Sequence, residues 1–321
     1  IIDNDIMMKV SKIFGEEGSD AWFAHDTEYF LPEGFKCPHC GSAKGFDKEK
    51  DIMDVWFDSG SSHAAVCARR KYLKVPADVY LEGADQYRGW FQSSLLTSVA
   101  GGHGAPYKQI ITHGWTVDGE GKKMSKSLGN GIAPQEIISK YGADILRLWV
   151  ASADYHADIR ISPEILKQIS DNYRKLRNTA RYCLSNLYDF DPDKDMVSND
   201  ELEELDKYAL MKLDEVIKIA RDAFEVYDYH TAAHSLHNFC VVEMSNFYFD
   251  VLKDRLYTSA PQSKTRRAAQ TVLYKVLDAL TLVLTPILAF TADEIWQSMP
   301  HDKSRNCLLY TSDAADEARS V

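Results

Sequence analysis

Long apolar runs and clustered cysteines are what this sequence of 321 residues lacks. No stretch approaches the roughly 18 consecutive apolar residues of a membrane-spanning helix, so we expect no membrane partner. A signal segment is missing too, and the chain opens on Ile1 without a methionine, which suggests that it begins inside a longer polypeptide. The six cysteines are too scattered for a disulfide framework, which favours reduced thiols and a cytoplasmic protein.

A net positive charge is also absent, because 48 acidic residues outweigh 37 lysines and arginines and give a formal net charge of −11. Such a charge argues against a nucleic-acid partner unless the basic residues are segregated along the chain. Residues 160–182 hold six basic residues against two acids, and residues 264–275 hold four basic residues and no acid. We therefore expect that either segment could meet a polyanion locally.

The middle of the chain has the pattern of a strand, a helix and a second strand. An apolar strand over residues 78–83 ends in glycine, a helix is predicted over residues 84–100, and residues 109–113 form the next strand. The helix carries one apolar stripe, formed by Tyr87, Phe91, Leu95 and Val99. This unit implies a parallel sheet of Rossmann type, in which ligands bind beyond the carboxyl ends of the strands. Glu82 and His113 stand at those ends.

Beyond residue 160 the strand pattern disappears, and amphipathic stripes predict an all-α helical bundle. The stripes run through Leu205, Ala209, Leu213, Val216, Ala220 and Phe224; through Leu236, Cys240, Met244, Phe247 and Val251; and through Ala269, Val272, Val276, Leu280 and Val283. We divide the chain into an irregular small module (1–50), an α/β region (51–160), a helical region (161–306) and an atypical tail (307–321).

The loop at residues 121–130 is the most informative segment. Two lysines and two serines stand around one methionine at residues 123–127, with glycine on both sides of the loop. Ammonium groups, hydroxyls and backbone N–H donors could together surround an anion there. The alternative is an exposed, solvated basic turn, as most charge runs are.

Four ordered blocks of the sequence resemble the class I aminoacyl-tRNA synthetases, and among these the isoleucyl-tRNA synthetases. Residues 123–130 spell the KMSKS signature with its following LGN, and HGWTVDG precedes it at residues 113–119. The further blocks are DVWFDSGSSH at 54–63, YLEGADQYRGWF at 80–91 and TPILAFTADEIW at 285–296. The HIGH signature and the editing insertion of these enzymes are missing, so the resemblance covers a carboxy-terminal portion of such an enzyme.

The resemblance implies an ATP-dependent ligase that activates L-isoleucine as isoleucyl-adenylate and transfers it to tRNA(Ile) in protein synthesis. It implies part of a Rossmann-type catalytic domain followed by an anticodon-binding helical bundle. ATP and Mg²⁺ would be the cofactors, and we expect a monomer that binds no DNA and forms no adenylate as this portion alone. A valyl or leucyl relative, and a stand-alone tRNA-binding module derived from such a synthetase, stay open as alternatives.

The same resemblance assigns roles residue by residue. Lys123 and Lys126 would be the catalytic cations. ATP would be bound by His113, Gly114, Ser125, Lys126 and Ser127. Isoleucyl-adenylate would be bound by Trp56, Glu82, Gly83, Asp85, Gln86 and Trp90. Structural roles are the alternatives for several of them: a helix cap for Asp85, core packing for the two indoles and a satisfied strand-end histidine for His113.

The first part of the bundle carries a possible tRNA contact. Arg174, Arg177 and Arg181 share one face if residues 172–181 are helical, and this basic stripe could follow the tRNA backbone. A solvated or internally paired face is the alternative.

One CxxC pair, Cys37 and Cys40, has the spacing of half a zinc knuckle. A tetrahedral site needs two more ligands and the sequence has no second CxxC, so zinc binding would require the full-length protein. The alternative is a tight turn with two free thiols, and the metal ligands stay unknown.

Overall fold

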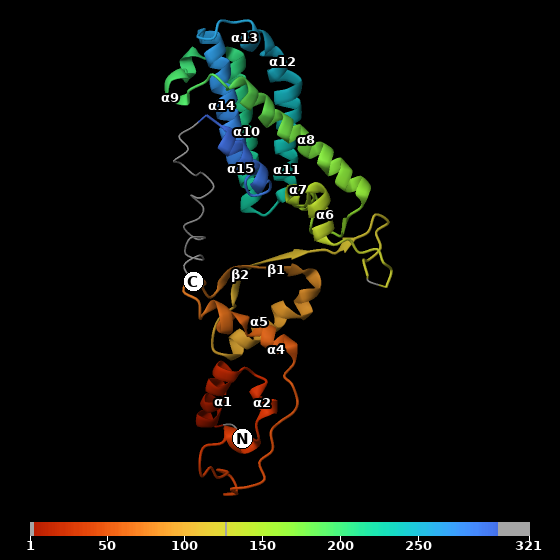
Figure 1. The fold of residues 1–321 in the computed structure, drawn as a ribbon, viewed down its shortest axis with the longest axis vertical. Coiled ribbons are helices and arrows are strands. Elements are labelled where there is room, and N and C mark those ends of the chain that lie inside the picture. Colours follow the sequence, from red (N-terminus) through yellow and green to blue (C-terminus); the bar gives the residue numbers. More distant parts are fainter. Residues whose placement is uncertain (1–2, 126, 301–321) are drawn as a thin grey trace. The chain divides into compact units, whose positions relative to one another are not determined.

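The computed structural model describes residues 3–125 and 127–300 and separates the chain into two compact units, Ile1–Asp58 and Ser59–Val321 (Figure 1). Lys126 and the tail after residue 306 therefore lie outside the described residues. Among the helices that are described, none is both long and apolar enough to cross a membrane.

The first unit begins with helices where we expected an irregular module. They are α1 (Asn4–Glu17), α2 (Ala21–Ala24) and α3 (Thr27–Phe30). Asp3 caps α1 by accepting hydrogen bonds from the backbone N–H groups of Asp5 and Ile6, both at 3.0 Å. The buried core of this unit is small, consisting of Ile13, Ala21 and Phe30. So few apolar contacts leave a weak periodic signal, and the expectation was wrong for residues 4–30.

The predicted strand–helix–strand unit is present in the second unit. Strands β1 (Ala77–Gly83) and β2 (Tyr107–His113) pair in parallel, with Gly83 opposite His113, which confirms the expected parallel arrangement. The connection is a 3₁₀ segment, η2 (Ala84–Arg88), followed by α5 (Trp90–Ala100), so the single helix that we predicted is interrupted at Gly89.

The face of α5 that packs inward differs from the predicted stripe. Phe91 of that stripe is buried as predicted, but Tyr87 and Val99 are exposed, and Ser94 and Ser98 are fully buried. The hydroxyls of Tyr80 on β1 and Ser94 lie 3.0 Å apart and form a hydrogen bond. Small serine side chains let the helix approach the strand closely, and a stripe drawn from apolar residues alone could not reveal this face.

A smaller parallel pair follows two residues after β2. It consists of β3 (Thr116–Val117) and β4 (Ile159–Arg160). Between these strands lie the loop at residues 121–130 and two helices, α6 (Pro134–Tyr141) and α7 (Ala143–Ala151).

The remaining helices form the predicted bundle, coloured green to blue in Figure 1. They are α8 (Pro163–Asn186), α9 (Pro192–Asp195), α10 (Glu204–Glu225), α11 (Tyr229–Asn238), the π-helical η4 (Phe239–Tyr248), α12 (Phe249–Val251), α13 (Lys253–Tyr257), α14 (Lys264–Leu284) and α15 (Ala289–Ser298), with a short 3₁₀ segment, η3 (Asn199–Glu201), before α10. Helix α10 packs against α11 and α14, and α14 also packs against α8 and α15. One continuous apolar core includes residues of all these elements except α9 and η3, which have no buried residue.

Two of the three predicted stripes lie in this core, and the second fails after its midpoint. Phe247 and Val251 are exposed, while Tyr248 and Leu252 are fully buried in their place. The cause is the π-helical segment Phe239–Tyr248, because each π turn contains more residues than an α turn and displaces the buried face along the sequence.

Candidate functional site

The carboxyl edge of the β1–β2 pair carries the polar side chains that the sequence predicted there. Glu82 Oε1 lies 4.0 Å from His113 Nε2, and the two side chains are 52% and 41% exposed. The other ring nitrogen of His113 lies 2.8 Å from the carbonyl oxygen of Gly114, to which it can donate. This edge therefore presents a carboxylate and an imidazole side by side, open to a ligand.

Close packing against backbone explains why residue 114 of this edge is a glycine. A Cβ atom on Gly114 would lie 2.4 Å from the carbonyl oxygen of Ala157, and one on Gly83 would lie 2.7 Å from Asp85 Oδ1. Any side chain at position 114 would push away the backbone at residues 157–158. Gly114 thus has a structural reason for its identity, and its predicted ligand contact remains a prediction.

Local contacts hold two of the predicted adenylate-binding residues, Gln86 in η2 and Trp90 at the start of α5. Gln86 Oε1 accepts from the backbone N–H of Trp90 at 3.0 Å, and the indole N–H of Trp90 donates to the carbonyl of Ser59 at 2.9 Å. The indole stacks on Tyr80 with ring centroids 4.2 Å apart and planes inclined by 3°. Gln86 and Trp90 are thus fixed in place by the fold, while the carboxylate of Asp85 stays exposed.

Trp56 belongs to the first unit, in α4 (Val55–Gly60), and its residue is 43% exposed. Its backbone N–H donates to Asp54 Oδ1 at 2.8 Å. Trp90 belongs to the second unit, so a shared wall formed by the two indoles stays a prediction.

In the sequence, the lysine–serine loop follows β3, which is separated from this edge by two residues. Lys123 forms an antiparallel bridge with Val117 of β3, and its ammonium group lies 4.5 Å from the centre of the Trp115 ring. The hydroxyls of Ser125 and Ser127 lie 3.1 Å apart. One cation and two hydroxyls are therefore held within one turn; Lys126, the strongest candidate by resemblance, is not among the described residues.

Trp115 was not among the residues predicted for this site. Its indole is 48% exposed and supports the Lys123 ammonium through a cation–π contact, although β3 itself begins only at Thr116. The sequence did place a tryptophan just before the short strand β3, and the lysine-rich segment follows that strand closely enough to pair with it.

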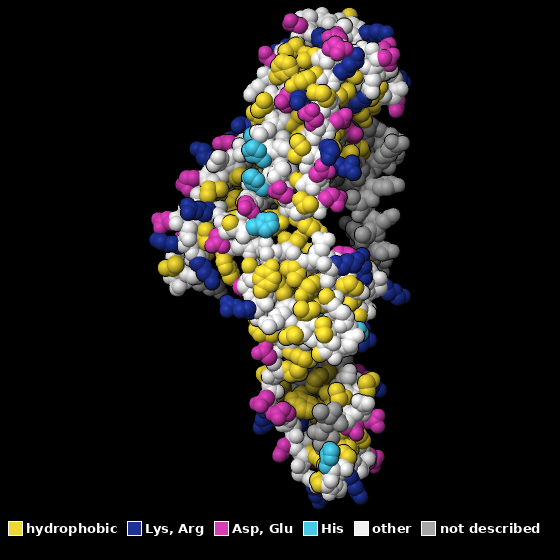
Figure 2. All heavy atoms as spheres, turned by 180° about the vertical axis from the view of Figure 1, so that it is seen from behind, with side chains coloured by type: hydrophobic (Ala, Val, Ile, Leu, Met, Phe, Trp, Pro, Cys, Tyr) yellow, Lys and Arg dark blue, Asp and Glu magenta, His cyan; other side chains and the backbone are white. Residues whose placement is uncertain are grey.

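The three predicted tRNA-contacting arginines on α8 differ in their partners. Arg174 pairs with Asp171 at 2.7 Å, and Arg177 pairs with Glu294. Arg181 forms no ion pair within the described part of the chain, and with Arg177 and Glu294 it lines a hollow of about 230 Å³. Figure 2 shows acidic and basic side chains interspersed over the face of the bundle that it presents. Of the three, Arg181 has the side chain most available to a phosphate.

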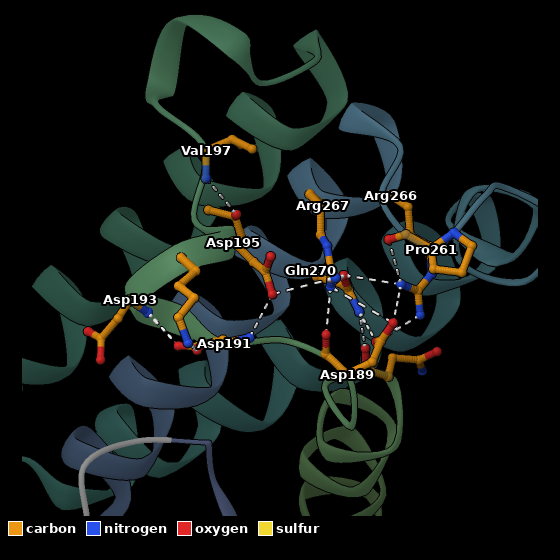
Figure 3. Close-up of polar contacts among 12 residues, drawn as sticks. Asp189, Asp191, Asp193, Asp195, Val197, Pro261, Arg266, Arg267 and Gln270 are labelled. Atoms are coloured by element: carbon orange, nitrogen blue, oxygen red, sulfur yellow. Dashed lines mark hydrogen bonds and ion pairs between the residues drawn. The ribbon is translucent and has the colours of Figure 1, made fainter.

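Two arginines of the basic segment 264–275, Arg266 and Arg267, belong to an internal network of hydrogen bonds and ion pairs (Figure 3). Arg266 and Arg267 are only 5% and 6% exposed. Arg266 donates to both carboxylate oxygens of Asp189, at 2.7 and 2.9 Å, and Gln270 donates to the same carboxylate at 2.8 Å. The expectation that this segment could meet a polyanion was therefore wrong for its two central arginines. Counting charges along one segment does not include an acid from a distant segment, such as Asp189, that pairs with them in the fold.

The CxxC pair forms a tight turn. The backbone N–H of Gly41, at φ 71°, donates to the carbonyl of Cys37 at 2.8 Å. Backbone N–H groups of Cys40 and His39 point at the Cys37 sulfur and lower the pKa of this thiol. Within the described residues no group of three or more histidines, cysteines or acids could hold a metal ion.

Two family models match the chain. Residues 1–162 match the model described as class I tRNA synthetases for I, L, M and V, and residues 206–318 match an anticodon-binding domain of tRNA ligase. The isoleucine–tRNA ligase of Caldanaerobacter subterraneus subsp. tengcongensis is 59% identical over 306 residues, and that of Natranaerobius thermophilus is 56% identical over 309 residues. These alignments cover 95% and 96% of the chain but 33% of each relative, so the chain spans about a third of their length.

Solved structures share the fold at low sequence identity. A LeuRS of Agrobacterium radiobacter K84, in a ternary complex with tRNA and LeuAMS, matches 84% of the chain and 34% of its own with a TM-score of 0.65 and 21% identity. Methionyl-tRNA synthetase of Mycobacterium tuberculosis, in complex with methionyl-adenylate, matches 75% of the chain and 49% of its own with a TM-score of 0.63 and 21% identity.

Proposed function

Because this chain belongs to the class I tRNA synthetases for isoleucine, leucine, methionine and valine, we propose that it is part of an isoleucine–tRNA ligase. The observation that carries the specificity is the 59% identity to isoleucine–tRNA ligases over 95% of the chain. Fold likeness at 21% identity cannot choose among amino acids, so a valyl or leucyl ligase has less support.

The proposed reaction has two steps. A carboxylate oxygen of isoleucine bonds to the α-phosphorus of ATP while the bond to the bridging oxygen breaks and pyrophosphate leaves. A ribose hydroxyl at the tRNA terminus then attacks the isoleucyl carbonyl and releases AMP. The first step is a displacement at a crowded, charged phosphorus, which depends on positioning and on cations placed where negative charge develops.

Residues of this chain would supply part of that environment. Lys123 and Lys126 would stabilise the charge on the departing pyrophosphate, with the Ser125 and Ser127 hydroxyls as donors. In support, the loop follows β3, which is separated by two residues from the strand edge that holds Glu82 and His113. By resemblance, this edge, with Gly83, Asp85, Gln86 and Gly114, would hold the adenylate, and the indoles of Trp56 and Trp90 would contact the isoleucine side chain.

The partners proposed for the complete protein are ATP, L-isoleucine and tRNA(Ile). Mg²⁺ would arrive bound to ATP, since the described residues contain no cluster suited to a metal. We propose a cytoplasmic monomer in which Arg181, and to a lesser extent Arg174 and Arg177, contact the tRNA backbone.

The test uses isoleucine-dependent pyrophosphate exchange by a chain of the relatives' length that contains these 321 residues. Lys126→Ala should lower exchange by about 100-fold or more, as expected for a cation aimed at developing charge. Lys122→Ala is the matched control, because the Lys122 ammonium pairs with Glu120 at 2.7 Å. Equal exchange by wild type and Lys126→Ala would refute the assignment.

A second arm separates the proposed enzyme from a tRNA-binding module. Exchange driven by valine or leucine in preference to isoleucine would reassign the substrate. Binding of tRNA(Ile) with no exchange for any amino acid would support the binding module. The 321-residue chain by itself should form no adenylate.

A further inference from the structure

The two ends of the lysine–serine loop are joined by one side-chain pair. The Asn130 amide group donates to Asp118 Oδ2 at 2.8 Å, linking positions that are 12 residues apart. Both side chains are half-buried. The contact closes the loop at its base, where β3 ends.

Each partner also holds the backbone of the loop. The second oxygen of Asp118 accepts from the backbone N–H groups of Glu120 at 3.0 Å and Lys122 at 2.8 Å. The amide oxygen of Asn130 accepts from the backbone N–H of Ser125 at 2.9 Å. The pair thus holds the backbone of the loop at residues 120, 122 and 125.

Asn130 is placed to orient the groups proposed to meet ATP. Asn130 binds the backbone of Ser125 and so helps to place the Ser125 hydroxyl. That hydroxyl lies 3.1 Å from Ser127 Oγ and accepts from the backbone N–H of Leu128 at 3.2 Å. Its amide nitrogen also lies 3.4 Å from the carbonyl oxygen of Lys123. In the described part of the loop, Asn130 contacts Lys123 and Ser125, which precede position 126.

We propose that Asn130, held by Asp118, is a positioning residue for the adenylation reaction: it fixes the loop so that the lysines and serines meet the triphosphate of ATP. The inference rests on the proposed function. The physical reason is the entropy of loop closure, because a loop already tied at its base loses less freedom when it closes over a ligand. Neither Asn130 nor Asp118 needs to touch ATP.

The chemistry of the pair also supports it. Asp118 gathers an amide and two backbone N–H donors, and these contacts, led by that of Asn130, lower the pKa of the carboxyl group. The carboxylate is ionised at neutral pH and gives Asn130 a charge-assisted hydrogen bond, the stronger kind.

The test exchanges the two side chains. In Asp118→Asn/Asn130→Asp the amide of residue 118 can donate to the carboxylate of residue 130, which can still accept from Ser125. Asn130→Asp alone sets two carboxylates against each other, and Asp118→Asn alone sets two amides. Glu120→Gln is the control, because the Glu120 side chain pairs only with the exposed Lys122 ammonium among the described contacts.

Two measurements read these variants. In the 321-residue chain, hydrogen exchange at the Ser125 and Leu128 amides should quicken at least tenfold in each single variant and return toward wild type in the exchanged pair. In a chain of the relatives' length, kcat for isoleucine-dependent pyrophosphate exchange should fall about 10- to 100-fold in each single variant, as for loss of a hydrogen bond to a charged group, with Tm unchanged. The exchanged pair should recover most of it.

The proposal is overturned if the single variants leave both measurements at wild-type values, or if the exchanged pair is no better than the single variants. Rescue of amide exchange in the loop without any rescue of kcat would also overturn it, since the pair would then serve only local folding. Failure of the proposed function would give a different result, because the wild-type chain of the relatives' length would then show no isoleucine-dependent pyrophosphate exchange at all.

Discussion

Arg177 on α8 and Glu294 on α15 are joined by two parallel hydrogen bonds, 2.7 Å from Nη1 to Oε2 and 2.6 Å from Nη2 to Oε1. The Glu294 carboxylate raises the pKa of Arg177, and the guanidinium lowers the pKa of Glu294. The side chains are 43% and 58% exposed, so the pair adds only about 0–1 kcal/mol to stability. Its larger effect is on recognition, because an arginine engaged at both nitrogens cannot offer the same fork to a phosphate.

We therefore expect the arginines of α8 to contribute unequally to tRNA binding. Arg181→Gln should weaken tRNA(Ile) binding by about threefold to tenfold and reduce the salt slope by about one, as for loss of one phosphate contact. Arg177→Gln should change affinity less than Arg181→Gln does. Titrations of the 321-residue chain with labelled tRNA at several salt concentrations measure both.

Glu294→Gln supplies the matched control for that comparison. It releases Arg177, so Arg177→Gln should cost more affinity in the Glu294→Gln background than in the wild type. Equal losses for Arg177→Gln in both backgrounds would show that the ion pair does not govern access to this arginine.

A second prediction rests on the cation–π contact between Lys123 and Trp115. An ammonium 4.5 Å from the centre of an exposed indole gains about 0.5–1 kcal/mol, equivalent to roughly a twofold to fivefold effect. Trp115→Leu should lower kcat/KM for ATP in pyrophosphate exchange by about that factor, because Lys123 loses its support. Trp115→Phe retains an aromatic face and should lose less; an equal loss in the two variants would mean that packing, and not the ring's charge distribution, holds the lysine.

A third prediction concerns Asp189, which accepts from Arg266 and Gln270 at the buried network of Figure 3. Arg266 lowers the pKa of the carboxyl group below its unfolded value of about 3.9. A lowered folded-state pKa means that the stabilisation is complete above the unfolded value and is lost as pH falls through the folded value.

Asp189→Asn should therefore destabilise the chain at pH 7 by about 3–5 kcal/mol, the cost of leaving the buried Arg266 guanidinium without its acid. The difference from wild type should begin to shrink as pH falls below about 4, where the carboxyl of the unfolded chain takes up a proton, and should disappear only when pH falls through the lowered folded-state pKa. Urea unfolding at pH 7 and pH 3.5 gives both values. A difference that is constant across this range would indicate that the lost interaction does not depend on the charge of Asp189.

The features that were predictable from sequence are those with a local cause. The alternation and terminal glycine of β1 predicted the edge that carries Glu82 and His113, and the regular stripe of α10 predicted its buried face. Features that depend on distant partners were not predictable. The acid that pairs with the buried Arg266 is 77 residues away in the sequence. The π-helical segment could not be recognised from the apolar stripe, and the prediction of buried residues was wrong from Phe247 onward.

The candidate site divides in the same way. Family motifs identified the lysine–serine loop, but not the side chains that hold it. Trp115 and Asn130 stand within the blocks HGWTVDG and LGN, but only their distances to Lys123 and Asp118 give them a role. Serines can also form a packing face, as Ser94 does, because closeness of approach and not hydrophobicity selects them.

The last prediction concerns the thiols. Backbone N–H groups lower the pKa of the Cys37 thiol, whereas burial raises that of Cys240 to about 12 and that of Cys183 further. Thiolate is the reactive form, so iodoacetamide at pH 7.5 should modify Cys37 well before Cys183 and Cys240 in the folded chain. Peptide mass spectrometry over time measures each site, and all three should react at similar rates in urea.

Zinc distinguishes the two interpretations of the CxxC turn. Two ligands cannot close a tetrahedral site, so added zinc should leave alkylation of Cys37 and Cys40 in the 321-residue chain unchanged. In a chain of the relatives' length that supplies a second ligand pair, zinc should protect both cysteines, because a coordinated sulfur is neither free nor nucleophilic, and a chelator should restore their reactivity. Reactivity that ignores zinc in the longer chain as well would leave the turn with two free thiols and no metal.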